Sequence, residues 1–210
     1  MTKLLSIASD AKTIKGQQGG YLTAIMYLQP DFDLCPKASK GCMASCLQFS
    51  GRMPMAKKAR IKRTLLFKND RLEFFNQLIK EIKAFIKRAN KKGLTPAIRL
   101  NGTSDINWAR EFIPKTPLSM PDGQLVDRGL SDMTIFDYFP KIQFYDYTPS
   151  LEYLNQQISP GRFNNYHLTF SLKENNLSDA FKAIDRGFNV AVVFRDKLPK
   201  RYLGRPVFDG

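Results

Sequence analysis

Residues 70–100, DRLEFFNQLIKEIKAFIKRANKKGLTPAIRL, carry the pattern that decides the fold. Through residues 70–92, apolar side chains recur every three or four positions, which is the period of an α-helix with one buried face. The apolar positions are Leu72, Phe75, Leu78, Ile79, Ile82, Phe85, Ile86 and Ala89. The run PAIRL that follows, residues 96–100, is short and apolar, as a buried strand is. This segment therefore predicts a helix that leads into a strand.

The rest of the chain repeats this alternation. Helices are predicted near residues 150–157 and 177–186, and further strands at 21–28, 141–146, 166–171 and 189–194. Alternating strands and helices with largely apolar strands indicate parallel βα units. Right-handed crossovers then give an α/β fold with a mainly parallel sheet and flanking helices, either an open sheet or a partial (β/α) barrel. The strands are too few for a closed barrel of about eight.

Length and composition fit a single α/β domain over residues 1–210. The chain is 43% hydrophobic and 25% charged, which is ordinary for a globular protein with a sizeable core. Residues 111–133, rich in proline and glycine, are predicted to be an irregular insertion. No apolar run approaches the ~20 residues of a transmembrane helix, and the amino-terminal residues lack the apolar core of a secretory signal. We therefore expect a cytoplasmic protein with no membrane partner.

The three cysteines form the sharpest motif. Cys35, Cys42 and Cys46 lie in the loop 33–51 with the spacing C-x6-C-x3-C, and the chain has no other cysteine. An odd number of clustered thiols in a reducing compartment argues against a disulfide framework and for a metal site. If a short helix covers 42–50, Cys42 and Cys46 share one face of it.

The cysteine spacing favours an iron–sulfur cluster over zinc. Zinc normally takes ligand pairs at C-x2-4-C spacing and four protein ligands. His167, the only histidine, could complete a Cys3His zinc site, although a histidine inside a strand is more often a core residue. Three cysteines without a fourth fit a cubane, [4Fe-4S], with one iron open or bound by another group. Zinc and purely structural thiols remain as alternatives.

Polar residues follow each predicted strand, where ligand sites of parallel α/β sheets lie. The candidates for a pocket around the cluster are Asn101, Ser104, Asp105, Tyr145, Asp146, Ser171, Glu174 and Arg195. Among them, Arg195 is predicted to anchor a small anionic ligand and Asp105 to be the polar partner of a ligand. The alternative is that these loop residues only cap the following helices. Strand alternation also places only about half of them inward.

The net charge of +14 indicates a second class of partner. Such an excess attracts polyanions, and residues 54–68 are predicted to form a very basic helix. Its candidates for contacts with nucleic-acid phosphates are Lys57, Lys58, Arg60, Lys62 and Arg63. A solvated helix face that only confers solubility explains the same residues.

Several of these segments together resemble the bacteriophage gene product 88 family. They are LLSIASDAKTIKG, GGYLTAIMYL, CPKASKGCMASCLQFSGR, RLNGTSDI, QFYDYT, NYHLTFS and NVAVVFR, and they span nearly the whole chain. The resemblance implies a phage origin, a location in the cytoplasm of the infected host cell, and a viral iron–sulfur protein. It implies no reaction. In outline, a parallel α/β fold with three cluster cysteines is also similar to radical S-adenosylmethionine enzymes, although their cysteine spacing differs.

Three functions therefore remain open from the sequence. The first is an iron–sulfur protein with redox or radical-type chemistry at an open iron. The second is a non-enzymatic sensor built on the same cluster. The third is a zinc-stabilised module that binds nucleic acid. Colour separates the first two from the third, because iron–sulfur proteins are brown and zinc proteins are colourless.

Overall fold

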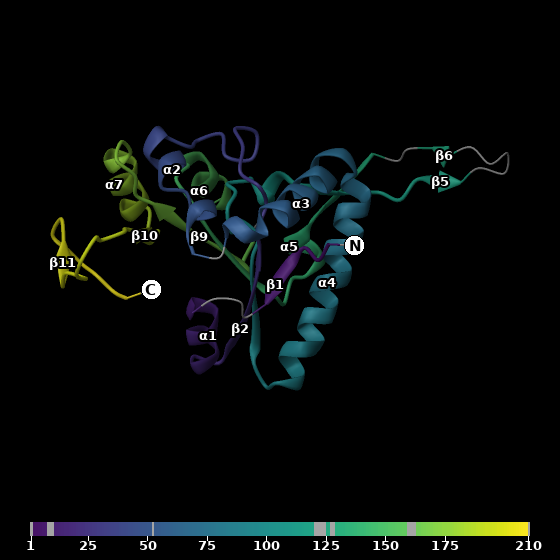
Figure 1. Cartoon of the computed structure of the whole chain (residues 1–210), viewed down its shortest axis with the longest axis horizontal. Helices are drawn as coiled ribbons and strands as arrows, with labels where there is room; N and C mark the ends of the chain where they lie inside the picture. Colours follow the sequence, from purple (N-terminus) through teal and green to yellow (C-terminus); the bar gives the residue numbers. More distant parts are fainter. Residues whose placement is uncertain are drawn as a thin grey trace.

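A six-stranded sheet forms the centre of the fold, in the order β1-β2-β3-β8-β9-β10 (Figure 1). Its strands are β1 (Leu5–Ile7), β2 (Tyr21–Met26), β3 (Thr95–Arg99), β8 (Gln143–Thr148), β9 (Tyr166–Ser171) and β10 (Val190–Ala191). Only β1 runs antiparallel to its neighbour, and the other pairs are parallel. The computed structural model describes residues 2–7, 11–51, 53–119, 125–126, 129–158 and 163–209. The predicted α/β class is confirmed, and β1 and β10 are the edges of an open sheet.

The four helices predicted at 54–68, 70–92, 150–157 and 177–186 are present as α3, α4, α6 and α7, whereas α1 was not predicted. The connection from β2 to β3 runs through α3 (Lys57–Asn69) and α4 (Arg71–Lys91), and α1 (Ala11–Gln18) joins β1 to β2. Later crossovers use α6 (Leu151–Ile158) and α7 (Leu177–Asp185). The Asp70 carboxylate caps α4 by accepting a hydrogen bond from the Glu73 amide at 3.0 Å. The predicted strand 189–194 is too long, because β10 ends at Ala191 and Val193 is 96% exposed.

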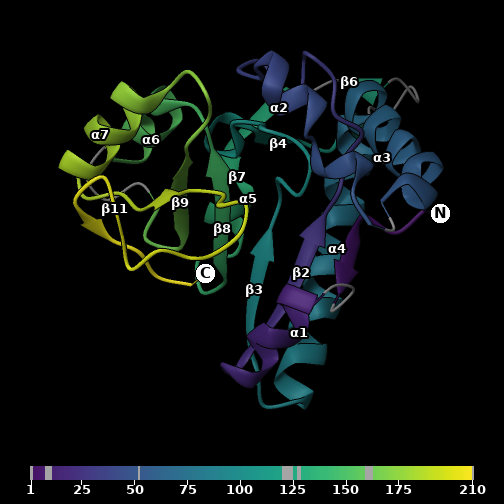
Figure 2. The same cartoon turned by 60° about the vertical axis from the view of Figure 1, so that its left-hand side comes forward.

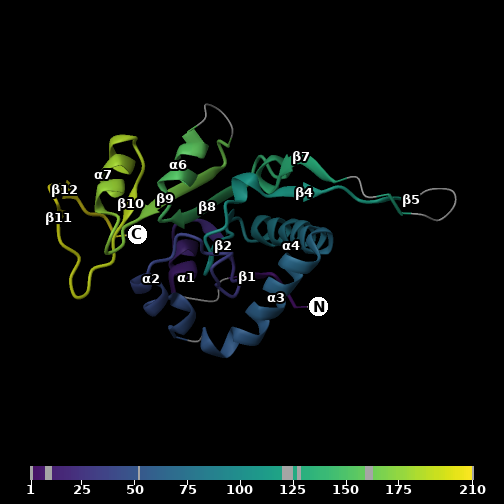
Figure 3. The same cartoon turned by 90° about the horizontal axis from the view of Figure 1, so that it is seen from above.

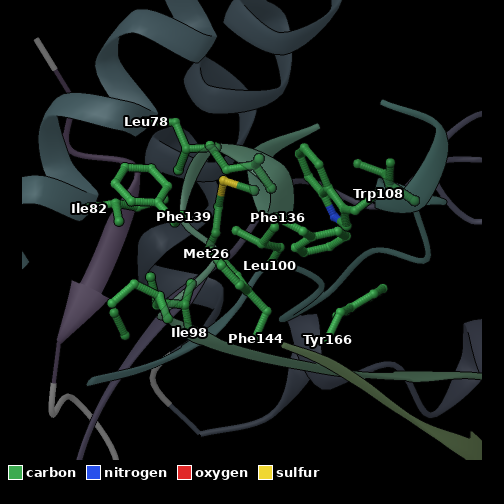
Figure 4. Close-up of a cluster of buried hydrophobic side chains, with 14 of the residues drawn as sticks. Met26, Leu78, Ile82, Ile98, Leu100, Trp108, Phe136, Phe139, Phe144 and Tyr166 are labelled. Atoms are coloured by element: carbon green, nitrogen blue, oxygen red, sulfur yellow. The ribbon is translucent and has the colours of Figure 1, made fainter. Parts of the chain in front are cut away.

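The main core lies between α4 and the sheet. Figure 4 shows Leu78 and Ile82 of α4 near Met26 of β2 and Ile98 of β3. Trp108 is fully buried and packs at 5.7–6.4 Å between ring centroids against Phe67, Phe74 and Phe75. This large aromatic contact fixes the loop after β3 against α3 and α4, and that loop carries the candidate site.

The segment 111–133 is a β-ribbon rather than an irregular insertion in the part that the structure describes. β4 (Phe112–Pro114) pairs with β7 (Leu130–Thr134), and β5 (Leu118–Ser119) pairs with β6 (Leu125–Val126), all antiparallel. Figure 3 shows these strands reaching away from the sheet. The prolines of this segment suggested irregular structure. A two-stranded ribbon, however, consists of edge strands, where proline is tolerated. The prediction for residues 120–124 and 127–128 lies outside the described residues.

The remaining elements are short. They are α2 (Lys40–Ala44), α5 (Ile135–Tyr138), a carboxyl-terminal hairpin of β11 (Arg201–Tyr202) and β12 (Arg205–Pro206), and 3-10 turns at Leu47–Phe49, Pro54–Ala56 and Trp108–Arg110. None of the helices in the described ranges has the length and apolar character needed to span a membrane.

Candidate metal centre

The cysteine loop begins after β2 and lies beyond the carboxyl ends of the parallel strands. Figure 2 shows α2 above the arrowheads of β2 and β3. The predicted helix 42–50 is wrong in its extent, because α2 covers Lys40–Ala44 and a separate 3-10 turn follows at Leu47. Ser45 ends α2, since its amide and its hydroxyl both donate to the Gly41 carbonyl, at 3.0 and 2.8 Å. Cys46 therefore lies outside α2, although Cys42 lies within it.

The three free thiols gather in one place. Cys35 and Cys46 are half-buried and Cys42 is exposed. The pKa of Cys35 is raised to about 12, mainly by burial and then by the Asp105 carboxylate, with smaller contributions from Cys46 and Cys42. Burial and then Cys46 also raise the pKa of Cys42, whereas Lys173 opposes this. The thiols and Asp105 are therefore near enough to one another to interact electrostatically.

Asn101 organises the loop that follows β3. Its side-chain oxygen accepts hydrogen bonds from Ser104 Oγ, the Ile106 amide and Trp108 Nε1 at 2.9–3.0 Å, and its amide nitrogen donates to the Ile106 carbonyl. Asn101 and Ser104 are therefore occupied with shaping their own loop. Both are buried, and neither side chain points a free polar group at the cysteines. The hydrogen bonds of both side chains are thus structural, and the prediction that they line a pocket stays untested.

Gly102 and Thr103 press this loop onto the end of β2. The Gly102 amide donates to the Met26 carbonyl at 2.9 Å, and a Cβ at Gly102 would lie only 2.5 Å from that oxygen. The Thr103 hydroxyl donates to the Leu28 carbonyl, and the Thr103 carbonyl lies 3.8 Å from the Cys35 thiol. The chain after β3 thus runs directly beneath the cysteine loop.

Asp105 ends this loop beside the thiols. Its amide donates to the Leu34 carbonyl at 2.8 Å, which ties it to the residue before Cys35. Asp105 is 7% exposed, and the Thr148 hydroxyl lies beside its carboxylate as a hydrogen-bond donor, although at a geometry too poor for a regular hydrogen bond. Burial raises its pKa to about 6, and Thr148, Lys173 and Lys37 only partly oppose this.

Asp146 supports the loop from β8. Its Oδ1 accepts a hydrogen bond from the Asn101 amide at 2.7 Å, and the Tyr166 hydroxyl donates to Oδ2 at 3.4 Å. The Arg99 guanidinium lies 3.9 Å away. Complete burial raises the pKa of Asp146 to about 7, despite Arg99. This carboxyl is therefore engaged in holding Asn101 in place.

The loop after β9 clamps α2 from the other side. Glu174 accepts a hydrogen bond from the Gly41 amide at 3.2 Å, and the hydrogen bond from Ser39 is the main cause that lowers its pKa. Lys173 donates to the Lys37 carbonyl at 2.8 Å. Ser171 is half-buried, and its carbonyl accepts a hydrogen bond from Asn176. Glu174 thus reaches the cysteine loop as predicted, with its carboxylate on the backbone of α2.

Three predicted residues lie apart from the thiols. Tyr145 alternates with the buried Phe144 and Asp146, so it faces the opposite side of the sheet. His167 pairs with Tyr145 in register and is exposed on β9, so it is neither a core histidine nor placed with the cysteines. Arg195 is exposed after β10, and no hydrogen bond or ion pair within the described ranges joins it to the site.

The basic helix divides into inward and outward charges. Arg60 is 1% exposed and donates to Gln29 and to the Met53 carbonyl, while Arg63 donates to the carbonyls of Lys3 and Tyr27. Burial of Arg60 contradicts its predicted contact with phosphates, whereas Arg63 is half-buried and its prediction stays untested. The three predicted lysines, Lys57, Lys58 and Lys62, are exposed on α3.

Several residues that interact electrostatically with the thiols or with Asp105 come from distant parts of the sequence and were not predicted. Thr148, Lys37 and Lys173 all affect the pKa of Asp105, and Asp105 and Cys35 affect that of Tyr153. The buried Arg60 lies near enough to Cys46 for the two to interact electrostatically. Nothing in the local sequence marks these residues, because the sheet order alone brings them to the same edge.

The pKa shifts of the thiols restrict the chemistry that they can perform. Raised thiol pKa values at Cys35 and Cys42 do not suit an activated nucleophile, which needs a lowered pKa. The described ranges contain no group of three or more His, Cys, Asp or Glu side chains that could hold a metal ion.

The comparisons with known proteins give a family and nothing more. A family model described as Gene product 88 matches residues 3–209. No curated protein and no solved structure matches the chain.

Proposed function

The chain belongs to the Gene product 88 family of bacteriophage proteins, and from this premise we propose that it binds an iron–sulfur cluster through Cys35, Cys42 and Cys46. The observation that carries the proposal is the gathering of all three thiols of the chain beside the buried carboxylate of Asp105. The protein would act in the cytoplasm of the infected host, where thiols stay reduced and available as ligands.

The spacing of the thiols favours a [4Fe-4S] cluster over zinc. A single zinc ion holds its sulfur ligands at about 2.3 Å, so it needs them converging on one point. A cubane binds each cysteine through a different iron, so three cysteines without a fourth fit it with one iron left open or bound by another group. His167, which a Cys3His zinc site would need, is exposed on β9.

Two cations near the thiols, Lys173 and Arg60, support the same proposal. A cluster held by three thiolates is anionic, and it gains stability from nearby cations. Lys173 lies close enough to Cys42 to lower its pKa, and Arg60 is close to Cys46. The same field would favour a small anionic ligand at an open iron.

Metal analysis after anaerobic purification and reconstitution with iron and sulfide tests the proposal. We expect a brown protein with about four irons and a similar amount of acid-labile sulfide per chain. Cys35→Ser, Cys42→Ser and Cys46→Ser should each lose most of the visible absorption. Ser50→Ala, an exposed change near the same loop, is the matched control and should keep it.

Two outcomes would refute the proposal. One is full iron content in all three cysteine variants. The other is a colourless protein with one zinc per chain whose zinc is lost in His167→Ala, because that result assigns the thiols to a Cys3His site.

A further inference from the structure

We propose that the outer face of α4 binds the sugar–phosphate backbone of double-stranded nucleic acid, independently of the base sequence. The contacts come from a row of exposed lysines on the solvent side of this helix, Lys80, Lys83, Lys87 and Lys91. This lysine row is separate from the proposed cluster site, and binding to it needs no cluster. It places the nucleic-acid contact on α4 rather than on α3, where the sequence predicted it.

The four lysines form one row because their spacing matches the period of the helix. They stand three or four residues apart, and residues at these spacings lie on the same face. On the opposite face Leu78, Ile82 and Phe85 are buried, which fixes the row toward solvent. At 1.5 Å per residue, the row from Lys80 to Lys91 is roughly 16 Å long. Each strand of B-DNA carries one phosphate per about 3.4 Å of its axis, so a row of this length can reach several phosphates at once.

The lysine row has no compensating negative charge of its own. The acids of α4 are Glu73 and Glu81. Glu73 lies in the first turn, before the row begins, and the Glu81 carboxylate accepts hydrogen bonds from the amides of Leu4 and Leu5 at 2.8–3.0 Å. Within the described ranges no ion pair involves any of the four lysines. The row therefore presents cations without an ion-pair partner to the solvent.

The stability of α4 alone does not explain this pattern. Lysines three or four residues apart repel one another, and such like-charge pairs destabilise a helix. The helix dipole favours cations in the last turn, which accounts for Arg88 and Lys91. It does not account for Lys80, Lys83 and Lys87, which lie before that turn. A row of one sign of charge instead matches a polyanion.

A hollow between the lysines gives a phosphate room to approach the helix. It is open to solvent and is lined by Asn76, Ile79, Lys80, Lys83, Ala84 and Lys87. Ala84 is exposed and has only a methyl side chain, so it takes up little of the space between the lysines. Lys83 is oriented by Tyr138, because its amine donates to the Tyr138 hydroxyl at 3.1 Å and lies 5.3 Å from the ring centroid. An ammonium group has three donors, so two remain for a phosphate.

The side chains of this face select the kind of polyanion. The structure describes α4 throughout, and its exposed residues include no large apolar or aromatic side chain. A membrane-binding helix inserts apolar side chains, and a protein interface has an apolar centre, so neither partner fits. Single strands are bound by stacking their bases on aromatic rings, and α4 exposes none. The phosphates of a duplex need only cations.

The neighbouring helix α3 is the poorer candidate for these contacts. Its Arg60 is buried, and Ile61 and Leu65 are 36% and 50% exposed on the face that carries its lysines. The exposed face of α3 therefore mixes apolar and basic side chains. Apart from Ala84, the exposed residues of α4 are all polar or basic.

The lysine row also lies away from the cysteine loop. The chain leaves the end of α4 to enter β3 at Thr95, so the last turns of α4 lie at the amino ends of the parallel strands, whereas α2 lies beyond their carboxyl ends (Figure 2). A duplex bound along the row leaves the thiols uncovered. The two sites can therefore be tested separately on the same full-length chain.

Fluorescence anisotropy with labelled DNA duplexes of two unrelated sequences tests the proposal. We expect both duplexes to bind alike, and the logarithm of the association constant to fall against the logarithm of salt concentration with a slope of about −3 to −4, since each phosphate contact contributes roughly −0.9. The double variant K80Q/K87Q should lower the steepness of this slope by about 2 and weaken binding by about tenfold or more. The charge-conserving variant K80R/K87R should keep the affinity within about twofold. The matched control K197Q/K200Q, which removes two exposed lysines elsewhere, should do the same.

Two further probes define the backbone that is bound. A DNA and an RNA duplex of the same sequence show which of the two binds more tightly, and a preference for either supports the inference. The matched single strand should bind about threefold more weakly than the duplex or worse, because α4 exposes no ring on which bases can stack. A single strand that binds more tightly than the duplex overturns the inference.

Thermal unfolding separates lost contacts from lost structure. K80Q/K87Q relieves repulsion between like charges, so the Tm of the free protein should stay the same or rise, and a lower Tm counts against the inference. The inference is overturned if K80Q/K87Q binds the duplexes as tightly as the wild type, or if K197Q/K200Q loses as much affinity. Cys42→Ser should bind the duplexes like the wild type. Failure of duplex binding and failure of the proposed cluster are therefore distinguishable.

Discussion

The loop 101–105 and the cysteine loop 35–46 meet at the carboxyl end of the sheet, yet they are held in very different ways. The first is buried throughout and is fixed by side-chain hydrogen bonds from Asn101, Thr103 and Asp146. The second is mostly exposed and is held by backbone turns and by contacts from Glu174 and Lys173. The loop 101–105 is therefore the rigid part of the site and the cysteine loop 35–46 the loosely held part. This difference suits a site whose cysteine loop becomes ordered when it binds its ligand.

Removing the Asn101 side chain should give the largest loss of stability. Asn101→Ala leaves the buried donors of Ile106 and Trp108 without an acceptor, so we expect unfolding to become easier by about 3–4 kcal/mol. Chemical denaturation of the metal-free protein measures this. Asn175→Ala, at an exposed position, should change it little. A similarly small loss of unfolding free energy in Asn101→Ala would mean that the loop 101–105 is not the rigid part of the site.

Adding one methyl group to Gly102 should be the next largest effect. A Cβ there would lie 2.5 Å from the Met26 carbonyl oxygen and 2.6 Å from the Tyr27 ring. Because backbone cannot yield easily, Gly102→Ala should cost about 2–3 kcal/mol. Gly19→Ala, where the nearest atom is 3.4 Å away, is the control for the general effect of the substitution. Equal denaturation midpoints for the two variants would contradict the close contact.

The pH dependence of stability should come mainly from Asp146, which accepts a hydrogen bond from the Asn101 amide. The pKa of Asp146 is raised to about 7 from 3.8, so the folded protein binds more protons than the unfolded chain between these values. The free energy of unfolding of the metal-free protein should then fall by roughly 1–3 kcal/mol as the pH rises through this window. Asp146→Asn should flatten this slope, although Asp105, with a pKa of about 6, leaves part of it. Parallel slopes in the two proteins would exclude Asp146 as the cause.

Loosening the cysteine loop should have the smallest effect on global stability. Glu174 is exposed, and its carboxylate accepts a hydrogen bond from the Gly41 amide. Glu174→Gln replaces this carboxylate by a neutral amide, which is a weaker acceptor. We expect an unchanged denaturation midpoint together with hydrogen exchange at residues 39–46 that is faster by several-fold. Asp179→Asn is the control, because it removes one negative charge from α7 at a position away from this contact. Unaltered exchange at 39–46 would mean that Glu174 does not restrain α2.

Local patterns predicted the elements, and long-range contacts decided their roles. The period of 70–92 gave α4 almost to the residue, because an apolar stripe and its cap depend only on near neighbours. Predictions failed where the deciding partner was distant in sequence or the context was an edge. Such cases are the ribbon formed by β4 and β7 and the short β10.

By itself the sequence determined an α/β chain with a mainly parallel sheet, one cluster of three thiols, and polar loops at the ends of the strands. Only the tertiary structure decided which polar residues face those thiols. It turned Arg60 and Arg63 inward, placed Tyr145 on the other side of the sheet, and occupied Asn101 within its own loop. It also buried Asp105 beneath the cysteine loop, with its amide bonded to the Leu34 carbonyl. The physical reason is that periodicity is a property of neighbouring residues, whereas a shared site depends on the order and register of strands far apart in the chain.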